Sequence, residues 1–398
     1  MKNCDVAIVG GGPVGGYISK IISKKGYKVE IFEEHEKIGT PLKCAGLISE
    51  RAFDLLEFPK KKVVENKIYG ANIQSPYGDI LTIGGDRIHA LVIDRTRFDQ
   101  EILNLAEKTG ASINLKTKVL SVKVKNNFVE IDINKDKKNI KIKSSLLIGA
   151  DGPYSKVRSS INLPKPKEFL KGIGASVENT SLDPKYVEIF VGRKIAPGFF
   201  AWVIPTKKDG TEARIGLCID DTSNYSLKQC FNVLLKQKIL KDIIIKKKIA
   251  GTIPLGPLKQ TTDDNVMIVG DAAAQVKPTS GGGIYPGILC GRYCSDVAIQ
   301  ALESQDFSGQ NLKRYNRLWT KDIGRELNLG MKFRRIIKNI DDKKMDKYIK
   351  KLNTTNNIEI INHYGDIDFP SKLAFPLFKK NPTFLKLIPT ALKKSKNK

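Results

Sequence analysis

Short apolar runs and amphipathic segments alternate along much of this chain. Four apolar runs are typical of strands buried on both faces: residues 5–9, 28–32, 146–152 and 266–271. Three segments with helical periodicity are predicted to be helices: residues 13–25, 94–110 and 282–304. Asp94 is a suitable N-cap for the second helix. Alternating buried strands and amphipathic helices predict an α/β fold in which helices cover a mostly parallel sheet.

Other parts of the chain alternate apolar and polar positions, as strands with one solvated face do. Residues 111–143 predict a β-meander. Further strands are predicted at residues 63–73, 80–83, 90–93, 171–178, 185–192, 199–205 and 213–219. A lysine-rich helix is predicted at residues 226–248, and the chain after residue 305 is mostly helical and basic. The fold class is therefore α/β, or α+β overall, with a second, mainly antiparallel part and a helical C-terminus.

The first strand leads into a glycine-rich turn. Gly10, Gly12 and Gly15 have the G-x-G-x-x-G spacing, and Pro13 opens the helix that follows. The first glycine allows a tight turn, the second lets the backbone approach a pyrophosphate, and the third lets the helix pack closely on the strand. Glu33 follows the second strand, where a carboxylate can bind a ribose. This order of elements favours a dinucleotide site over a glycine turn without a ligand.

Composition narrows the choice of partners. The 398 residues include 68 Lys and Arg against 42 Asp and Glu, a formal net charge of +26. This excess favours anionic partners, although no nucleic-acid-binding motif is found and nucleic acid is not expected. Six scattered cysteines and three distant histidines predict neither a disulfide scaffold nor a metal site. No secretory signal or membrane-spanning run is found, so a cytoplasmic location is expected.

Four segments together resemble the flavoprotein monooxygenase superfold and, within it, the geranylgeranyl reductase family. They are the glycine turn with Glu33, the loop 41–46 (PLKCAG), the strand 200–205 (FAWVIP) with Gly216, and the segment 270–284 (GDAAAQVKPTSGGGI). The loop is similar to the family's P-x-x-C-x-G loop, and the last segment to its G-D-A-A-G-x-x-x-P-x-x-G-G-G-I. The strand departs from the family's Y-x-W-x-F-P at its first and fifth residues, and it is also similar to flavin-dependent halogenases.

The resemblance implies that the chain binds FAD. It places Asp271 at the sugar hydroxyls, Arg95 near the phosphates and the backbone of Val119 at the adenine. It places the backbone N–H groups of Gly281, Gly282, Gly283 and Ile284 at the pyrimidine edge of the flavin ring. The set of residues implied for FAD is Gly10, Gly12, Pro13, Gly15, Glu33, Cys44, Ala45, Gly46, Arg95, Val119, Asp151, Gly270, Asp271, Gly281, Gly282, Gly283 and Ile284. The set implied for the substrate is Phe200, Trp202, Pro205 and Gly216.

Cys44 is the candidate catalytic residue. In the family that this chain resembles, the cysteine loop lies on the flavin face, near the substrate double bond. Saturating an isolated alkene requires a hydride at one carbon and a proton at the other, and a positioned thiol could donate that proton or steer the developing charge. A small, soft side chain that only shapes the pocket is the alternative. The sequence leaves both roles open.

The resemblance implies a reductase that saturates the double bonds of geranylgeranyl chains. The expected substrate is an archaeal-type glycerol ether phospholipid of membrane lipid biosynthesis, with free geranylgeranyl diphosphate as the alternative. A different class, an FAD-dependent monooxygenase or halogenase of a small aromatic compound, shares the superfold, but the cysteine loop argues against it. No second dinucleotide fingerprint is found, so the electron donor stays open between NAD(P)H and ferredoxin.

The chain is expected to divide into three parts. These are a discontinuous FAD-binding domain (1–61, 94–164 and 251–305), an antiparallel substrate-binding domain (62–93 and 165–250) and a basic helical C-terminal region (306–398). Residues 373–398 combine large apolar residues with many lysines, which suits a segment lying on an anionic bilayer. A short helix closing over the core, followed by a solvated tail, is the alternative. Peripheral membrane association is the expectation.

Overall fold

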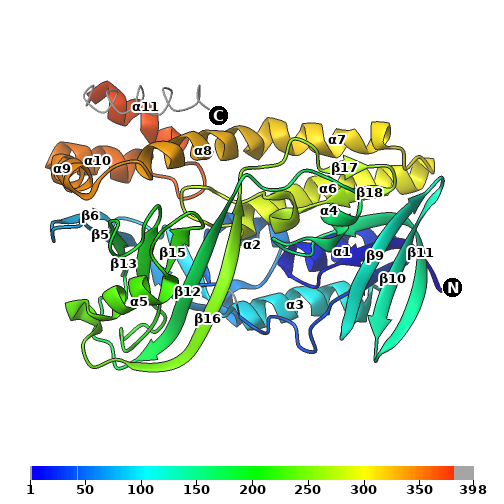
Figure 1. The fold of residues 1–398 in the computed structure, drawn as a ribbon, viewed down its shortest axis with the longest axis horizontal. Coiled ribbons are helices and arrows are strands. Elements are labelled where there is room, and N and C mark those ends of the chain that lie inside the picture. Colours follow the sequence, from blue (N-terminus) through cyan, green and yellow to red (C-terminus); the bar gives the residue numbers. More distant parts are fainter. Residues whose placement is uncertain (1, 43, 381–398) are drawn as a thin grey trace.

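Two large sheets lie toward opposite ends of the long axis of the molecule, and helices run across them (Figure 1). The computed structural model describes residues 2–42 and 44–380. The predicted α/β class, with a mostly parallel sheet, a β-meander, a second antiparallel sheet and C-terminal helices, is confirmed. The part of the predicted membrane-contacting tail at 381–398 lies outside the described residues.

The first sheet has the strand order β17-β18-β11-β1-β2-β8, and β9 and β10 extend it as a meander. Its strands are β1 (Lys2–Val9), β2 (Val29–Phe32), β8 (Ser112–Asn114), β9 (Thr117–Lys125), β10 (Phe128–Lys135), β11 (Lys138–Gly149), β17 (Thr262–Asp263) and β18 (Val266–Ile268). The five strands β18, β11, β1, β2 and β8 are parallel. Their carboxyl ends therefore share one edge, as the sequence predicts.

Helices cover one face of this sheet. They are α1 (Pro13–Ser23), α6 (Ile284–Ser304) and α7 (Gly309–Trp319), and α3 (Arg95–Lys108) packs on α1. Ile18 of α1 and Trp319 of α7 join Val6 and Ile8 of β1 in one buried cluster. The meander covers the other face, where Ile131 packs with the side chains that alternate with these along β1. The Asp94 N-cap is confirmed, since its side chain accepts a hydrogen bond from Arg97 N.

The second sheet has the order β16-β12-β15-β14-β13-β5-β6 and is antiparallel except between β13 and β5. Its strands are β5 (Gly70–Gln74), β6 (Ile80–Gly84), β12 (Glu168–Glu178), β13 (Tyr186–Val191), β14 (Phe200–Pro205), β15 (Glu212–Asp220) and β16 (Ile244–Leu255). A small sheet has the order β3 (Leu47–Ile48), β7 (Ala90–Ile93) and β4 (Val64–Ile68), and its strands come before and after β5 and β6 in the chain. The division into domains stays a prediction.

Three predicted elements are wrong in extent. The helix predicted at 226–248 ends early: α5 is Leu227–Leu235, a 3₁₀ turn follows at Lys238–Leu240, and β16 then pairs with β12. The isoleucines of β16 are β-branched and favour a strand where a neighbouring strand is available for backbone hydrogen bonding. The strand predicted at 63–73 is two strands in different sheets. Conversely, the end of the meander predicted at 111–143 and the apolar run predicted at 146–152 form one strand, β11. This strand pairs with β10 of the meander and with β1 of the parallel sheet.

The remaining helices lie mostly after residue 319. They are α2 (Arg51–Leu56), α4 (Lys156–Ser160), a π-helical turn (Thr320–Gly324), α8 (Arg325–Ile337), α9 (Asp342–Leu352), α10 (Thr355–Tyr364) and α11 (Ser371–Lys380), with 3₁₀ turns at Lys60–Lys62 and Gly270–Ala273. In Figure 1, α7 and α8 run along the top of the molecule, and α9 and α10 lie at its left end above β5 and β6. Within 2–42 and 44–380, every helix is too short or too polar to cross a membrane.

Candidate functional site

The carboxyl edge of the first sheet brings the predicted nucleotide residues together. Gly10 directly follows β1 and Glu33 directly follows β2. Asp151 lies two residues after the end of β11, and Asp271 follows β18 by three residues. Because these strands are parallel neighbours, their ends meet although 261 residues separate the first and last of these positions. The discontinuous nucleotide site is a consequence of this strand order.

The glycine turn has the space that a phosphate requires. Gly10 has φ +105°, and a Cβ there would lie 2.3 Å from the Ala150 carbonyl oxygen. A Cβ on Gly15 would lie 2.1 Å from the Gly10 carbonyl oxygen, so helix and turn touch directly. In contrast, a Cβ on Gly12 would meet no atom within 4 Å. The first and third glycines are therefore needed for packing, and the second faces open space, as a pyrophosphate site requires.

Two helix N-termini face this edge without a side-chain cap. Pro13 opens α1 and Ile284 opens α6, and in both helices no side chain caps the first turn. The helices lie close, since a Cβ on Gly287 would be 2.8 Å from Val14. Uncapped N–H groups and two positive dipole ends favour an anionic ligand. These features of the described chain fit FAD, whose pyrophosphate is anionic.

The acidic residues at the strand ends also form hydrogen bonds with nearby backbone groups of the protein. Glu33 accepts hydrogen bonds from Gly11 N (2.8 Å) and His35 N (2.9 Å), and its carbonyl oxygen accepts from Thr117 N where β9 begins, two residues before Val119. Asp151 Oδ2 accepts from the first turn of α4, whereas its Oδ1 is buried without a partner among the described residues. Burial raises the pKa of Asp151. Contacts of these residues with FAD stay predictions.

The loop 274–283 closes the site from the α6 side. Lys277 N donates to the Gly282 carbonyl oxygen (3.1 Å), and Gly281 N donates to the Lys277 carbonyl oxygen (2.8 Å), so the loop forms a closed turn. A Cβ on Gly283 would lie 2.8 Å from Asp271 Oδ1. The structure thus places Asp271 against the glycines that the sequence assigns to the flavin ring, with Gly270 one residue before it.

Arg95 links the nucleotide side of the site to the cysteine loop. Its guanidinium forms hydrogen bonds of 2.9 and 3.0 Å with the Asp99 carboxylate. Burial opposes its charge, but Asp99 and the nearby Cys44 thiol raise the pKa of Arg95. Cys44 is half-buried, and its sulfur accepts from Gly46 N at 3.4 Å. The sequence connects Arg95 to the phosphates only, so its contact with Cys44 is new.

The partly buried carboxyl of Asp271 gives this region a pH-dependent stability. Burial raises the pKa of Asp271 from 3.8 to about 6, although Arg95 opposes the shift. In the FAD-free protein, the free energy of unfolding should therefore fall as the pH rises from about 4 through about 6, since the folded state disfavours the ionised carboxyl. Asp271→Asn lacks this ionisation and should be more stable than the wild type by about 1–3 kcal/mol at pH 7.5.

Urea unfolding of both FAD-free proteins at pH 4.5 and 7.5 checks this. At pH 4.5, where the folded state is still protonated, the gain in stability should be about a third of that at pH 7.5. An equal gain at both pH values would mean that the asparagine stabilises the fold for a reason unrelated to ionisation.

Three of the predicted substrate residues, Phe200, Trp202 and Gly216, share one face of the second sheet, whereas Pro205 alternates onto the opposite face. Phe200 and Trp202 alternate along β14 with Ala201 and Val203, which pack on the α5 side. The Phe200 ring is half-buried and lies edge-on to Trp202 with centroids 6.1 Å apart. Trp202 packs directly on Gly216, where a Cβ would lie 2.6 Å from its ring. Pro205 is buried at the end of β14.

This aromatic face borders the rest of the site. Trp202 shares one apolar cluster with Ala45 of the cysteine loop and another with Val276 of loop 274–283. A Cβ on Gly281 would meet Ile253 of β16 at 2.9 Å. The cysteine loop, the glycines and the aromatic face thus converge, and Trp202 Nε1 is buried there without a partner in the described chain.

The sequence does not predict two hydrogen bonds of Arg214 that position the cysteine loop. Arg214 on β15 donates to the carbonyl oxygens of Ala45 (3.2 Å) and Ile93 (2.8 Å) and so holds the cysteine loop against the second sheet. A Cβ on Gly46 would lie 2.5 Å from its guanidinium, which makes a glycine necessary there. No local signal predicts this contact. Asp99, in contrast, lies four residues after Arg95 on one helix, a spacing that signals an ion pair.

Comparison with known proteins agrees with this geometry. Residues 3–289 match the family model described as an FAD binding domain. The chain therefore belongs to this family of flavoproteins, and it is an FAD-dependent oxidoreductase. The expectation that FAD is its cofactor is confirmed, and the residues at the carboxyl edge fit that cofactor.

Similar proteins define the class of flavoprotein more closely. The chain is 30% identical over 357 residues to the digeranylgeranylglycerophospholipid reductase of Methanocaldococcus jannaschii, a match that covers 87% of this chain and 90% of that protein. It is 34% identical over 386 residues to an uncharacterised protein of the same organism, with 94% and 95% covered. A geranylgeranyl bacteriochlorophyll reductase-like structure from Thermoplasma acidophilum superposes with TM-score 0.88 at 23% identity, covering 98% of this chain and all of that one. The chain is a member of the geranylgeranyl reductase family.

Proposed function

We propose that this protein saturates the double bonds of geranylgeranyl chains on archaeal-type glycerol ether phospholipids. The observation that carries the proposal is its similarity to digeranylgeranylglycerophospholipid reductases, which extends through the cysteine loop and β14. For the reductase of Methanococcus vannielii, the match covers 97% of both chains at 28% identity. Free geranylgeranyl diphosphate is the alternative substrate, and the net charge of +26 suits either anion.

Held at the carboxyl edge of the first sheet, reduced FAD would supply the hydride for one alkene carbon. Cys44 supplies the proton for the other carbon, so that the double bond gains two hydrogens. The guanidinium of Arg95, which lies close enough to the thiol to interact with it electrostatically, offsets the negative charge that the proton leaves on sulfur. Asp99 holds that guanidinium in place through its 2.9 and 3.0 Å bonds. Arg214 fixes the loop that carries the thiol.

The isoprenoid chain lies against the aromatic face of the second sheet. Phe200 and Trp202 offer apolar ring surface, and Gly216 leaves room for the Trp202 ring to lie flat on β15. The electron donor, NAD(P)H or ferredoxin, is a transient partner. Reduction of the bound flavin by each donor under anaerobic conditions distinguishes the two.

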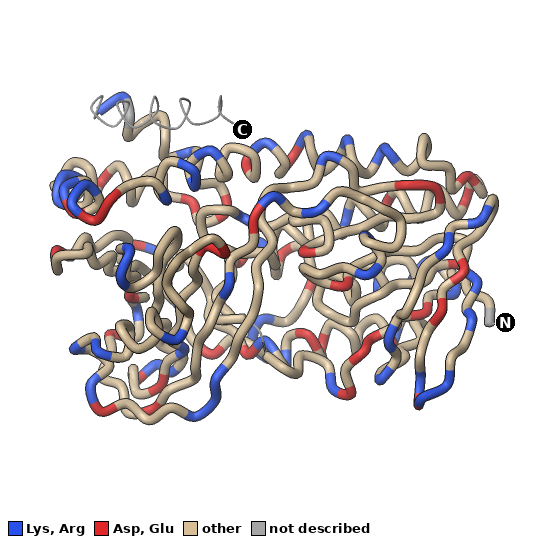
Figure 2. Tube along the Cα trace, viewed as in Figure 1, with Lys and Arg blue, Asp and Glu red and all other residues tan. Residues whose placement is uncertain are grey.

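Peripheral membrane contact is the second part of the proposal. Lysines gather on α9 and α11, at one end of the molecule (Figure 2). On α11, the Phe375 side chain is 76% exposed beside Lys372 and Lys379. Exposed aromatic and basic residues together suit an anionic lipid surface. Phe375→Ser should weaken cosedimentation with anionic vesicles, whereas Tyr154→Ser, an equally exposed aromatic far along the chain, should not.

The reaction itself is tested with the flavin reduced chemically in the absence of oxygen. Addition of a geranylgeranyl ether phospholipid should reoxidise the flavin, and mass analysis should find two hydrogens gained per reduced double bond. Reoxidation by geranylgeranyl diphosphate alone would favour the alternative substrate. A flavin that is inert toward both lipids and is reoxidised only by oxygen would overturn the proposal in favour of a monooxygenase or halogenase.

A further inference from the structure

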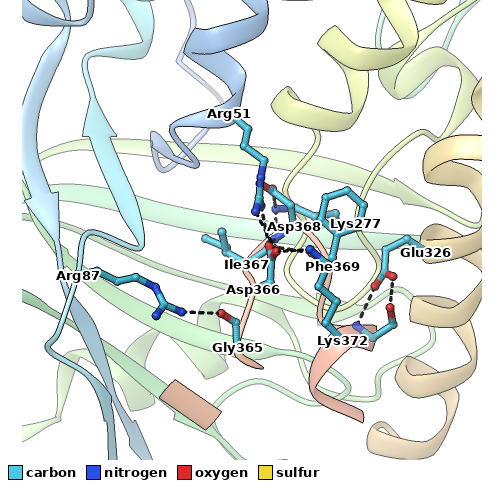
Figure 3. A network of polar contacts seen from close by, with 11 residues as sticks. Arg51, Arg87, Lys277, Glu326, Gly365, Asp366, Ile367, Asp368, Phe369 and Lys372 are labelled. Atoms are coloured by element: carbon cyan, nitrogen blue, oxygen red, sulfur yellow. Dashed lines mark hydrogen bonds and ion pairs between the residues drawn. The ribbon is translucent and has the colours of Figure 1, made fainter. Parts of the chain in front are cut away.

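A short segment of the C-terminal region reaches back to the flavin side of the molecule. Residues 365–369, here called the strap, connect α10 to α11. Figure 3 shows the polar contacts that hold the strap: Arg51 of α2 binds Asp366, and Arg87 donates to the Gly365 carbonyl oxygen. Phe369 packs edge-on against Tyr285 of α6, with ring centroids 6.2 Å apart.

The innermost contact of the strap is a buried ion pair with loop 274–283. Lys277 Nζ lies 2.8 Å from Asp368 Oδ1 and donates to the Ile367 carbonyl oxygen at 2.9 Å. The side chain of Asp368 is 0% exposed and that of Lys277 is 7% exposed. Arg51 adds a second cation at 3.1 Å from Asp368 Oδ2. A lysine this deeply buried needs its carboxylate partner, because an unpaired buried charge is strongly disfavoured.

The side chain of Lys277 runs along the glycines of the same loop. A Cβ on Gly282 would lie 2.8 Å from Lys277 Cε and 3.3 Å from Nζ. The backbone of Lys277 also closes the loop, through its bonds to Gly282 and Gly281. One residue thus fixes the loop by its main chain and places a positive charge beside it by its side chain.

We propose that Lys277 is a positioning residue that sets the redox potential of the bound flavin, and that Asp368 of the strap offsets its charge. This inference rests on the proposed placement of the flavin ring at Gly281–Gly283. Reduced flavin carries negative charge, so a cation held nearby in a water-poor environment favours the reduced form. The strap thereby connects the C-terminal region to the chemistry of the cofactor.

The two partners should act in opposite directions. Lys277→Met removes the cation and leaves Asp368, so the preference for reduced over oxidised FAD should fall about tenfold, or about 30 mV for a two-electron couple. Asp368→Asn leaves the cation unopposed by this carboxylate and should raise the preference. The double variant Lys277→Met/Asp368→Leu replaces the pair by apolar groups, which buried sites often tolerate. Its preference for reduced over oxidised FAD should lie between those of the two single variants.

The test measures the midpoint potential of the bound flavin and the dissociation constant of oxidised FAD in each variant. Lys372→Met is the matched control, because it removes a 3.1 Å contact between an exposed lysine and Asp366 of the strap and should not shift the potential. Equal potentials in Lys277→Met, Asp368→Asn and wild type, or shifts of the same sign, would overturn the inference. Failure of the wild type to reduce any geranylgeranyl lipid would instead refute the proposed function and leave these potentials interpretable.

Discussion

Replacing Arg334 with methionine is expected to lower the free energy of unfolding by about 3–5 kcal/mol. Arg334 lies on α8, is 3% exposed, and binds Glu168 of β12 (3.0 Å) and Asp220 of β15 (2.9 Å). It also donates to the Gly198 carbonyl oxygen at 2.7 Å, just before β14. Without the guanidinium, two carboxylates and a carbonyl at the junction of helix and sheet lose their main partner.

Lys338→Met provides the control for this prediction. Lys338 reaches the same two carboxylates at 3.4 and 3.1 Å, but its side chain is 28% exposed. Its removal leaves Arg334 in place and should cost about 1 kcal/mol or less. Denaturant unfolding of both variants gives the comparison. Equal losses would mean that total charge, and not the buried guanidinium, stabilises the contact between α8 and the second sheet.

Replacing Cys44 with alanine is expected to slow alkene reduction by about 10²–10⁴-fold, the range of general acid catalysis. Arg95 should then face no sulfur, while Asp99 still holds it. FAD binding and reduction of the flavin by a chemical reductant should not change, because the contacts implied between the loop 41–46 and FAD can be made by its backbone without the thiol. The check is single-turnover reoxidation of the reduced flavin by a geranylgeranyl lipid.

Cys44→Ser separates the two roles that the sequence leaves open. A hydroxyl is close in size to a thiol but is a much weaker acid, so it fills the pocket without donating a proton as readily. Serine should therefore be nearly as slow as alanine if Cys44 is the proton donor. Serine activity close to the wild type, with alanine much slower, would mean that shape alone matters.

The nucleotide site was predictable because its signals are local. Gly10, Gly12 and Gly15 lie within one turn, and Asp271 stands a few residues from its glycines, so spacing alone carries the geometry. The contacts that position these groups are not local. Lys277 and Asp368 are 91 positions apart, and Arg214 and Ala45 are 169 positions apart. Only the fold brings such partners together, and the sequence pattern around one partner does not predict the other.

Element boundaries failed where tertiary pairing decided the conformation. The lysines and isoleucines of residues 244–255 fit a helix as well as a strand by composition, and the ladder with β12 decides for the strand. The pattern of apolar and polar residues changes along β11. Its first part pairs with β10 of the meander and has one solvated face, whereas its last part pairs with β1 in the parallel sheet and is covered on both faces. A change of pattern within one strand therefore reads as two elements when the sequence is considered alone.

The strand order of the first sheet also determines when this protein can fold during its synthesis. β1 pairs with β11 at Val6 and Leu146, and β11 pairs with β18 at Leu147 and Val266. Between β11 and β18 the ribosome makes five of the seven strands of the second sheet. At about 5–20 residues per second, an N-terminal strand waits on the order of tens of seconds before the last parallel partner emerges. The nascent chain therefore carries an open, apolar sheet edge for most of its translation, and we expect chaperones to bind it during that interval.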